Sequence, residues 1–83
     1  MPQPYERITG EFSAQHGVRA LGPDEATALL DLARVVANTS DDRRAAPLSC
    51  YLAGVLLAGI DSEAERVRRI REIAAGYSSP MNG

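Results

Sequence analysis

The sequence is poor in the residues on which most metal proteins and enzymes rely. Its 83 residues include one Cys, one His and no Trp. A single Cys50 cannot form an intramolecular disulfide, and a lone His16 excludes the usual His/Cys metal constellations. We therefore expect no metal site and no bound cofactor. An autonomous enzyme is disfavoured because this composition offers no pairing of a nucleophile with a base.

Basic charge and long apolar runs are scarce as well. Lys is absent, so all nine basic residues are Arg, and the formal net charge is −2, which argues against nucleic-acid binding. The most apolar stretch, residues 45–59, is shorter than the ~20 residues that a membrane span requires. No hydrophobic run follows a basic patch near the N-terminus, so we expect no signal peptide and a cytoplasmic protein.

Helical periodicity is what the chain does contain. A chain of this length suits one domain, residues 1–83. The apolar spacings and the Pro, Gly and Ser signals predict four helices with short connections, which favour antiparallel neighbours. We expect these helices at about residues 4–16, 23–38, 47–58 and 62–75, with a tail over 76–83.

The second predicted helix has the clearest start and the broadest apolar face. Pro23 suits the first helical position, and two carboxylates follow it at the positive end of the helix dipole. Leu32 and Val35 widen the face. Its centre is made by Ala26, Leu29, Leu30, Ala33, Val36 and Ala37.

The segment 45–59 is apolar on every side, and we expect the rest of the chain to be arranged around it. Pro47 suits a first helical position and Gly59 a left-handed helix end. A helix that is apolar all round has to be covered on all sides. The sequence therefore predicts an all-α, four-helix bundle-like domain in which helix 47–58 is the buried centre.

The last predicted helix begins with a capping-box pattern formed by Ser62 and Glu65, and Gly76 is expected to stop it. Val67, Ile70 and Ala74 form its apolar stripe. Four arginines, at positions 66, 68, 69 and 71, alternate with Glu in this helix. We interpret them as a solvated face with i,i+4 pairs, the alternative being a docking face for an acidic partner.

Arg43 and Arg44, directly before helix 47–58, are the candidate ligand contacts. Free N–H groups at a helix start attract anions, and two guanidinium groups would strengthen the binding of phosphate or carboxylate. The alternative is that both arginines pair with Asp41 and Asp42 in a solvated loop. The first turns of the helix complete the candidate ligand- or partner-binding surface with Pro47, Ser49 and Tyr51.

Cys50, Gly54 and Ala58 are four residues apart and make a strip of small side chains. Such a strip lets another backbone approach closely, so it predicts either an intrachain helix crossing or a self-association face. We interpret Cys50 itself as a small apolar residue, because no cationic neighbour would activate its thiol. A homodimer would cover apolar surface that four short helices leave bare.

A family resemblance adds to this picture. The chain contains LLDLARVVA at residues 29–37, then Arg43, then AAPLS at 45–49 and YLAG at 51–54. These residues resemble a small actinobacterial family of domains of unknown function. Its members occur alone or fused behind a molybdenum-cofactor guanylyltransferase. Two departures from the family pattern are Asn38, where a His is usual, and Tyr5, where Trp is frequent.

The resemblance implies an association with molybdenum-cofactor biosynthesis or with a molybdoenzyme. The nucleotide-binding motifs of the transferase are absent from this chain. We therefore expect a non-enzymatic accessory module that docks on a protein of that pathway through Arg43, Arg44 and the start of the third predicted helix. The alternative is a small-ligand binder that holds a phosphate-bearing cofactor or a nucleotide at the same place.

Overall fold

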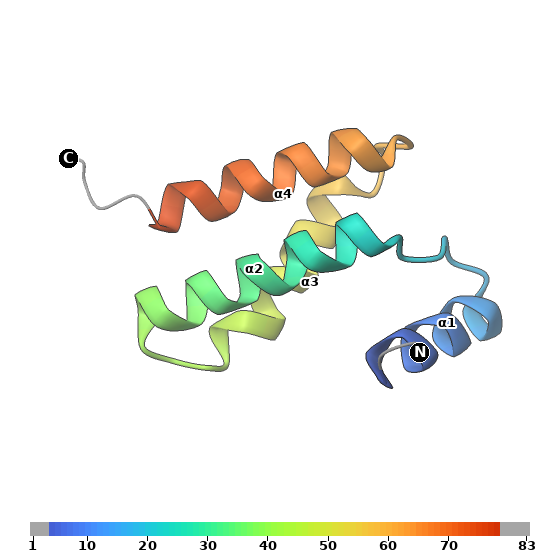
Figure 1. The fold of residues 1–83 in the computed structure, drawn as a ribbon, viewed down its shortest axis with the longest axis horizontal. Helices are drawn as coiled ribbons and strands as arrows, with labels where there is room; N and C mark the ends of the chain where they lie inside the picture. The colour runs from blue at the N-terminus through green and yellow to red at the C-terminus, as the bar shows by residue number, and fades with distance from the viewer. Residues whose placement is uncertain (1–3, 79–83) are drawn as a thin grey trace.

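The computed structural model describes residues 4–78, and helices account for most of them (Figure 1). The helices are α1 (Pro4–His16), α2 (Pro23–Ser40), α3 (Ala45–Leu57) and α4 (Glu63–Ser78). No strand occurs within these residues, and the predicted all-α fold is confirmed. Of the predicted tail over 76–83, residues 79–83 lie outside the described part of the chain.

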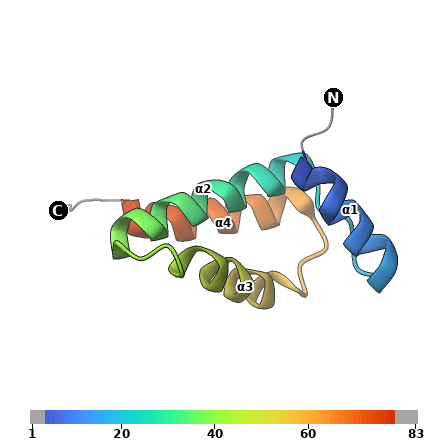
Figure 2. The ribbon, with the colours of Figure 1, turned by 90° about the horizontal axis from the view of Figure 1, so that it is seen from below.

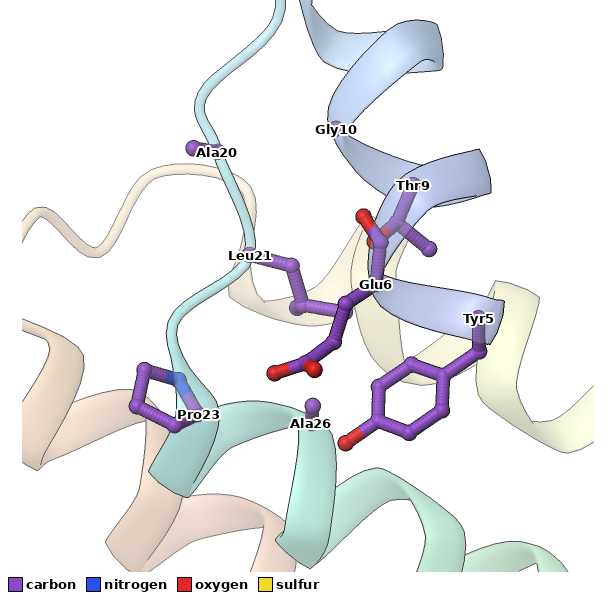
Figure 3. Close-up of a pocket in the computed structure, with 8 residues that line it drawn as sticks. All are labelled: Tyr5, Glu6, Thr9, Gly10, Ala20, Leu21, Pro23 and Ala26. Atoms are coloured by element: carbon purple, nitrogen blue, oxygen red, sulfur yellow. The ribbon is translucent and has the colours of Figure 1, made fainter. Parts of the chain in front are cut away.

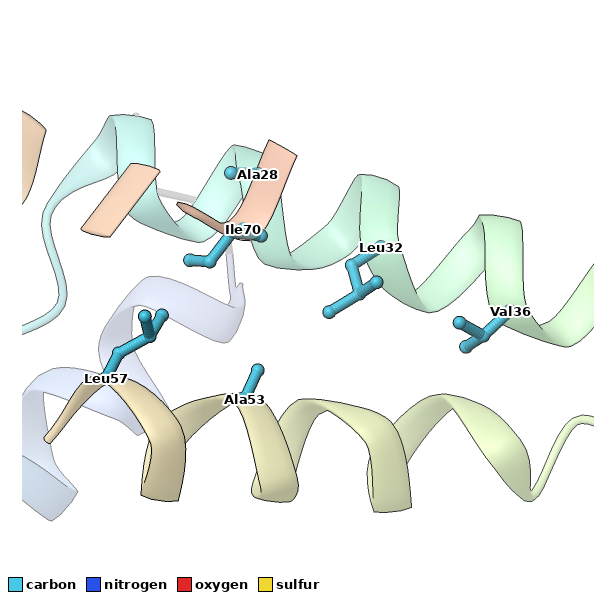
Figure 4. Close-up of a cluster of buried hydrophobic side chains, with 6 residues drawn as sticks. All are labelled: Ala28, Leu32, Val36, Ala53, Leu57 and Ile70. Atoms are coloured by element: carbon cyan, nitrogen blue, oxygen red, sulfur yellow. The ribbon is translucent and has the colours of Figure 1, made fainter. Parts of the chain in front are cut away.

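The centre of the bundle is α2. It packs against both α3 and α4, which lie along neighbouring sides of it, whereas α3 and α4 barely touch each other (Figures 1 and 2). Leu32 of α2 and Ile70 of α4 are the largest of the fully buried side chains. The core cluster contains Ala28, Leu32 and Val36 from α2, Ala53 and Leu57 from α3, and Ile70 from α4 (Figure 4).

The prediction that helix 47–58 is buried on all sides is wrong. In α3 only Ala53 and Leu57 are buried. The reason is geometric, because α2 can cover only one face of α3 and no helix packs on the opposite face. Five large apolar side chains of α3 are consequently 58–69% exposed: Leu48, Tyr51, Leu52, Val55 and Leu56.

Helix α1 lies apart from the other three helices, at the end of the bundle where α2 begins (Figures 1 and 2). None of its residues is buried, and its large apolar side chains Tyr5, Ile8 and Phe12 are 37–56% exposed. A cavity of about 170 Å³ separates α1 from the connector and from the start of α2. Tyr5 points across it toward Ala26 (Figure 3).

The helix ends agree with the sequence signals in some places and differ in others. Gly17 closes α1 at a φ of 65°, as expected of a left-handed helix end. Helix α2 ends at Ser40, two residues beyond the predicted boundary, and the left-handed residue that follows it is Asp41, at a φ of 56°. Pro47 is the third residue of α3, still within the first turn, where a missing N–H costs little. Gly59 does not take the predicted left-handed conformation.

Helix α4 starts as its capping signal predicts and ends later. The hydroxyl of Ser62 accepts the backbone N–H of Glu65 at 3.2 Å, which is one half of a capping box. The carboxylate of Glu65 pairs instead with Arg68 and Arg69. Gly76 lies inside the helix and does not stop it. A helical Gly costs up to about 1 kcal/mol relative to Ala, which the surrounding helix tolerates.

One side chain of the predicted solvated arginine face is buried. Arg66 is 4% exposed. Its Nε donates to Oε2 of Glu25 at 2.9 Å, and its Nη1 donates to the carbonyl oxygens of Ile60 and Asp61 at 2.7 and 2.8 Å. This cluster joins the start of α2 to the loop between α3 and α4. The arginines at 68, 69 and 71 are exposed and paired with carboxylates, as expected.

The backbone at the start of α2 is held by a second carboxylate. The backbone N–H of Glu25 donates to Oε2 of Glu63 at 3.4 Å. The same carboxylate lies against Gly22, where an added Cβ would come within 2.0 Å of Oε2. The side chains of α4 thus fix the first turn of α2 both through Arg66 and through Glu63.

Removing Arg66 tests the importance of this cluster. We expect Arg66→Ala to lower the free energy of unfolding by roughly 3–5 kcal/mol, because it leaves the carboxylate of Glu25 buried without its partner. Arg68→Ala, on the exposed side of the same helix, should lower the free energy of unfolding far less, because an exposed ion pair contributes little. Urea denaturation followed by circular dichroism measures both values. Equal losses for the two variants would contradict the structural role of Arg66.

Candidate binding site

Arg44 is already occupied by an intrachain partner. Its Nε and Nη2 donate to Oδ1 and Oδ2 of Asp42 at 3.0 and 2.9 Å. This hydrogen bonding holds the pKa of Asp42 below, and that of Arg44 above, its ordinary value. For Arg44, the structure therefore shows the pairing with a loop carboxylate that the sequence left as an alternative.

Arg43 is the other predicted contact. Its side chain is exposed, and within residues 4–78 no carboxylate lies within ion-pairing distance of it. It stands two residues before α3, at the end of the helix where Ala45 and Ser49 also lie. The guanidinium of Arg43 is therefore available to a partner, which that of Arg44 is not.

The backbone donors at the start of α3 are engaged inside the chain. The N–H of Arg44 donates to Oδ1 of Asp42 at 3.0 Å. The N–H groups of Ala45 and Ala46 donate to the carbonyl oxygens of Asp42 and Arg43 at 3.0 and 3.1 Å. Pro47 has no N–H to offer. Little of the donor set that would bind an anion at a helix start is left.

The remaining predicted contacts lie on different faces of α3. Ser49 is half-buried between α3 and α4, whereas Tyr51 is more than two-thirds exposed. Pro47 is exposed in the first turn. On a helix, residues two positions apart do not share a face. The structure thus brings Ser49 to a groove and leaves Tyr51 and Pro47 outside it.

An apolar groove runs between α3 and α4 because these helices lean on α2 without closing over it. It encloses about 250 Å³ and continues into a second cavity of about 230 Å³ toward the loop between α2 and α3. Tyr77 and Ser49 line both parts. The main part is lined by Leu32, Ser49, Leu52, Ala53, Leu56, Ile73 and Tyr77.

Sequence reasoning missed this groove, although part of its signal was present. Leu52 and Leu56 are four residues apart on α3, as are Ile73 and Tyr77 on α4. Each pair therefore lies on one helix face. The sequence did not show that the two faces border the same opening, because that depends on how α3 and α4 are placed around α2.

The strip of small residues divides in the same way. Cys50 is half-buried and its thiol lies 3.6 Å from the carbonyl oxygen of Leu29 in α2. Burial raises the pKa of this thiol. Gly54 and Ala58 are exposed, and an added Cβ at Gly54 would meet nothing within 4 Å. Only the Cys50 end of the strip contacts another helix of the chain.

Other chemistry is sparse in the part of the chain that the structure covers. Over residues 4–78 no three His, Cys, Asp or Glu side chains gather in a way that could hold a metal ion. His16 lies at the end of α1 with its ring 4.5 Å from that of Phe12. Among the described helices, none has the length and apolar character needed to cross a membrane.

The buried position of Cys50 leads to a prediction about its reactivity. A raised pKa leaves less thiolate at any given pH, so the native thiol should react slowly and only accelerate as the pH rises well above 8. We expect alkylation by iodoacetamide at pH 8 to be several-fold slower in the native chain than in the chain unfolded with urea. Equal rates would show that the contact with α2 does not shield the thiol.

Comparison with known proteins identifies a family but no activity. Neither the comparison with curated proteins nor that with solved structures gives a match. A family model described as a domain of unknown function, DUF6457, matches residues 6–82. This match covers nearly the whole sequence, and the chain belongs to the DUF6457 family.

Proposed function

We propose that this domain is a non-enzymatic interaction module that binds a helix of a partner protein in the groove between α3 and α4. The observation that carries the proposal is the groove itself, which is apolar, open to solvent and floored by Leu32 of the core. Grooves of this kind recognise amphipathic helices that insert side chains at helical spacing. Leu52 and Leu56 on one side and Ile73 and Tyr77 on the other provide the contacts.

The partner that we propose is a protein of molybdenum-cofactor biosynthesis or a molybdoenzyme. Support comes from the resemblance to domains fused behind the guanylyltransferase, which is strongest over residues 43–54. This segment contains Arg43 and most of α3. A partner helix lying in the groove with an acidic residue near the start of α3 would pair with the free guanidinium of Arg43.

A direct binding measurement tests this proposal. The purified chain is titrated by biolayer interferometry against the guanylyltransferase and a molybdoenzyme of the same organism. We expect Leu56→Glu to weaken binding at least about tenfold, because it places a charge in the apolar groove. Val55→Glu, the adjacent and equally exposed position outside the groove, should bind within about threefold of the native chain. Arg43→Ala should weaken binding by a smaller factor.

Two results would contradict the proposal. The first is no binding of either protein at concentrations up to about 100 μM, because the affinity would then be too weak even for a transient interface. The second is a loss of binding by Val55→Glu that equals or exceeds the loss by Leu56→Glu. Circular dichroism of each variant confirms that the helices are intact before binding is compared.

A second function, binding of a phosphate-bearing ligand, is favoured by one observation, the free guanidinium of Arg43. Calorimetric titration with GTP, GMP and a molybdopterin analogue discriminates it from the first. Because the backbone donors around Arg43 are engaged, we expect no heat of binding with a dissociation constant below about 1 mM. Tighter binding that disappears in Arg43→Ala would replace the interaction module with a ligand binder.

A further inference from the structure

The side of α3 that faces away from α2 has a regular apolar pattern. Leu48, Tyr51, Val55 and Ala58 follow one another at spacings of three, four and three residues, and all four are exposed. We call these four residues the outer seam. Spacings that alternate between three and four residues place side chains along one face of a helix, which is the pattern of helices that pair with another helix. The outer seam is separate from the groove, which Leu52 and Leu56 line.

We propose that the outer seam binds the outer seam of a second copy of this chain, with the two α3 helices antiparallel. The exposed parts of Leu48, Tyr51 and Val55, the large side chains of the outer seam, amount to roughly 400 Å², with a large side chain taken as roughly 200 Å². This lies within the ~300–600 Å² of the largest patches on monomers, which are often functional, and is about half of the ~800 Å² per partner of a standard interface. Pairing of two copies covers most of this surface.

The sizes of the side chains fit an antiparallel register. When the twofold axis crosses the outer seam at the level of Ala53 along the helix, Leu48 of one copy lies opposite Ala58 of the other, and Tyr51 lies opposite Val55. Each pair joins a larger side chain to a smaller one, and each occurs twice, as an isologous interface requires. Gly54, next to the seam, leaves open space that lets the second backbone approach.

The charges at the two ends of α3 favour the same direction. Between Ala45 and Ile60 the chain has no charged side chain. Arg43 before the helix is exposed. Asp61 after it has a side-chain exposure of 104% and only a long ion pair, to Arg19 at 4.0 Å. Antiparallel pairing brings the Arg43 end of one copy to the Asp61 end of the other, whereas parallel pairing would place Arg43 beside Arg43. Opposite charges at both ends therefore select the antiparallel arrangement.

Sedimentation equilibrium of the purified chain tests the dimer. At about 50 μM we expect a mass twice the 8.9 kDa of the single chain. Val55→Glu should raise the dissociation constant of the dimer at least about a hundredfold, because the twofold axis places two new carboxylates in one apolar interface. Leu56→Glu is the matched control, since it is adjacent and equally exposed but lies in the groove, and it should leave the dimer intact.

The register is tested by mixing two chains that both contain Cys50→Ser. One also carries Tyr51→Cys and the other Val55→Cys. Under mild oxidation the antiparallel register forms a disulfide between the two different chains, which mass spectrometry identifies. Each chain alone should remain largely uncrosslinked, because in this register neither position meets itself.

Three outcomes overturn the proposal. They are a monomer at all concentrations up to about 200 μM, a dimer that Leu56→Glu disrupts and Val55→Glu does not, and efficient crosslinking of Tyr51→Cys with itself. If the chain is a monomer and Val55→Glu abolishes its binding to a different protein, the outer seam binds that protein instead of a second copy. The proposal does not rest on the groove function, because the two surfaces are separated by the variants at positions 55 and 56.

Discussion

The packing of α2 against both α3 and α4 is the constraint on which the remaining structure depends. Leu32 of α2 and Ile70 of α4 are fully buried, and the other residues of their core cluster come from α2 and α3. Because α3 and α4 both pack against α2 but barely contact each other, a groove remains between them. The far side of α3 is left without a neighbour in the chain for the same reason.

This arrangement explains why an apolar helix ends up on the surface. A helix such as α3, apolar on every side, needs more cover than three helices can provide, and α1 does not supply it. The bare area divides into the edge that borders the groove, with Leu52 and Leu56, and the outer seam that begins at Leu48. Both edges are apolar and open to solvent.

Local signals in the sequence predicted the four helices, whereas they did not predict how these helices pack against one another. Pro23 and Ser62 are residues that begin or cap helices, so the starts of α2 and α4 could be recognised without tertiary information. The position of α3 in the bundle could not be predicted in this way, because a uniformly apolar helix has no periodicity that distinguishes its covered face from its exposed one. Arg66 was predicted to be solvated like the arginines at 68, 69 and 71. It lies four residues before Ile70, however, and therefore shares the buried face of α4 with it.

The candidate site shows the same limit. Asp42 stands two residues before Arg44, and their pairing was one of the alternatives that the loop sequence suggested. The groove needs residues from α2, α3 and α4 at once, so no single segment could reveal it. The segment 43–54 that carries the family resemblance contributes only one wall of it.

The chain contains no lysine, and all of its arginines other than Arg66 are exposed, where an ion pair contributes little to stability. Position 66 is different. There a planar guanidinium reaches a carboxylate with one nitrogen and two backbone carbonyls with another. A lysine ammonium, with one nitrogen on a flexible stem, cannot reproduce that fork. Within this family, an arginine at position 66 would therefore mark chains that build the same corner between their second and fourth helices.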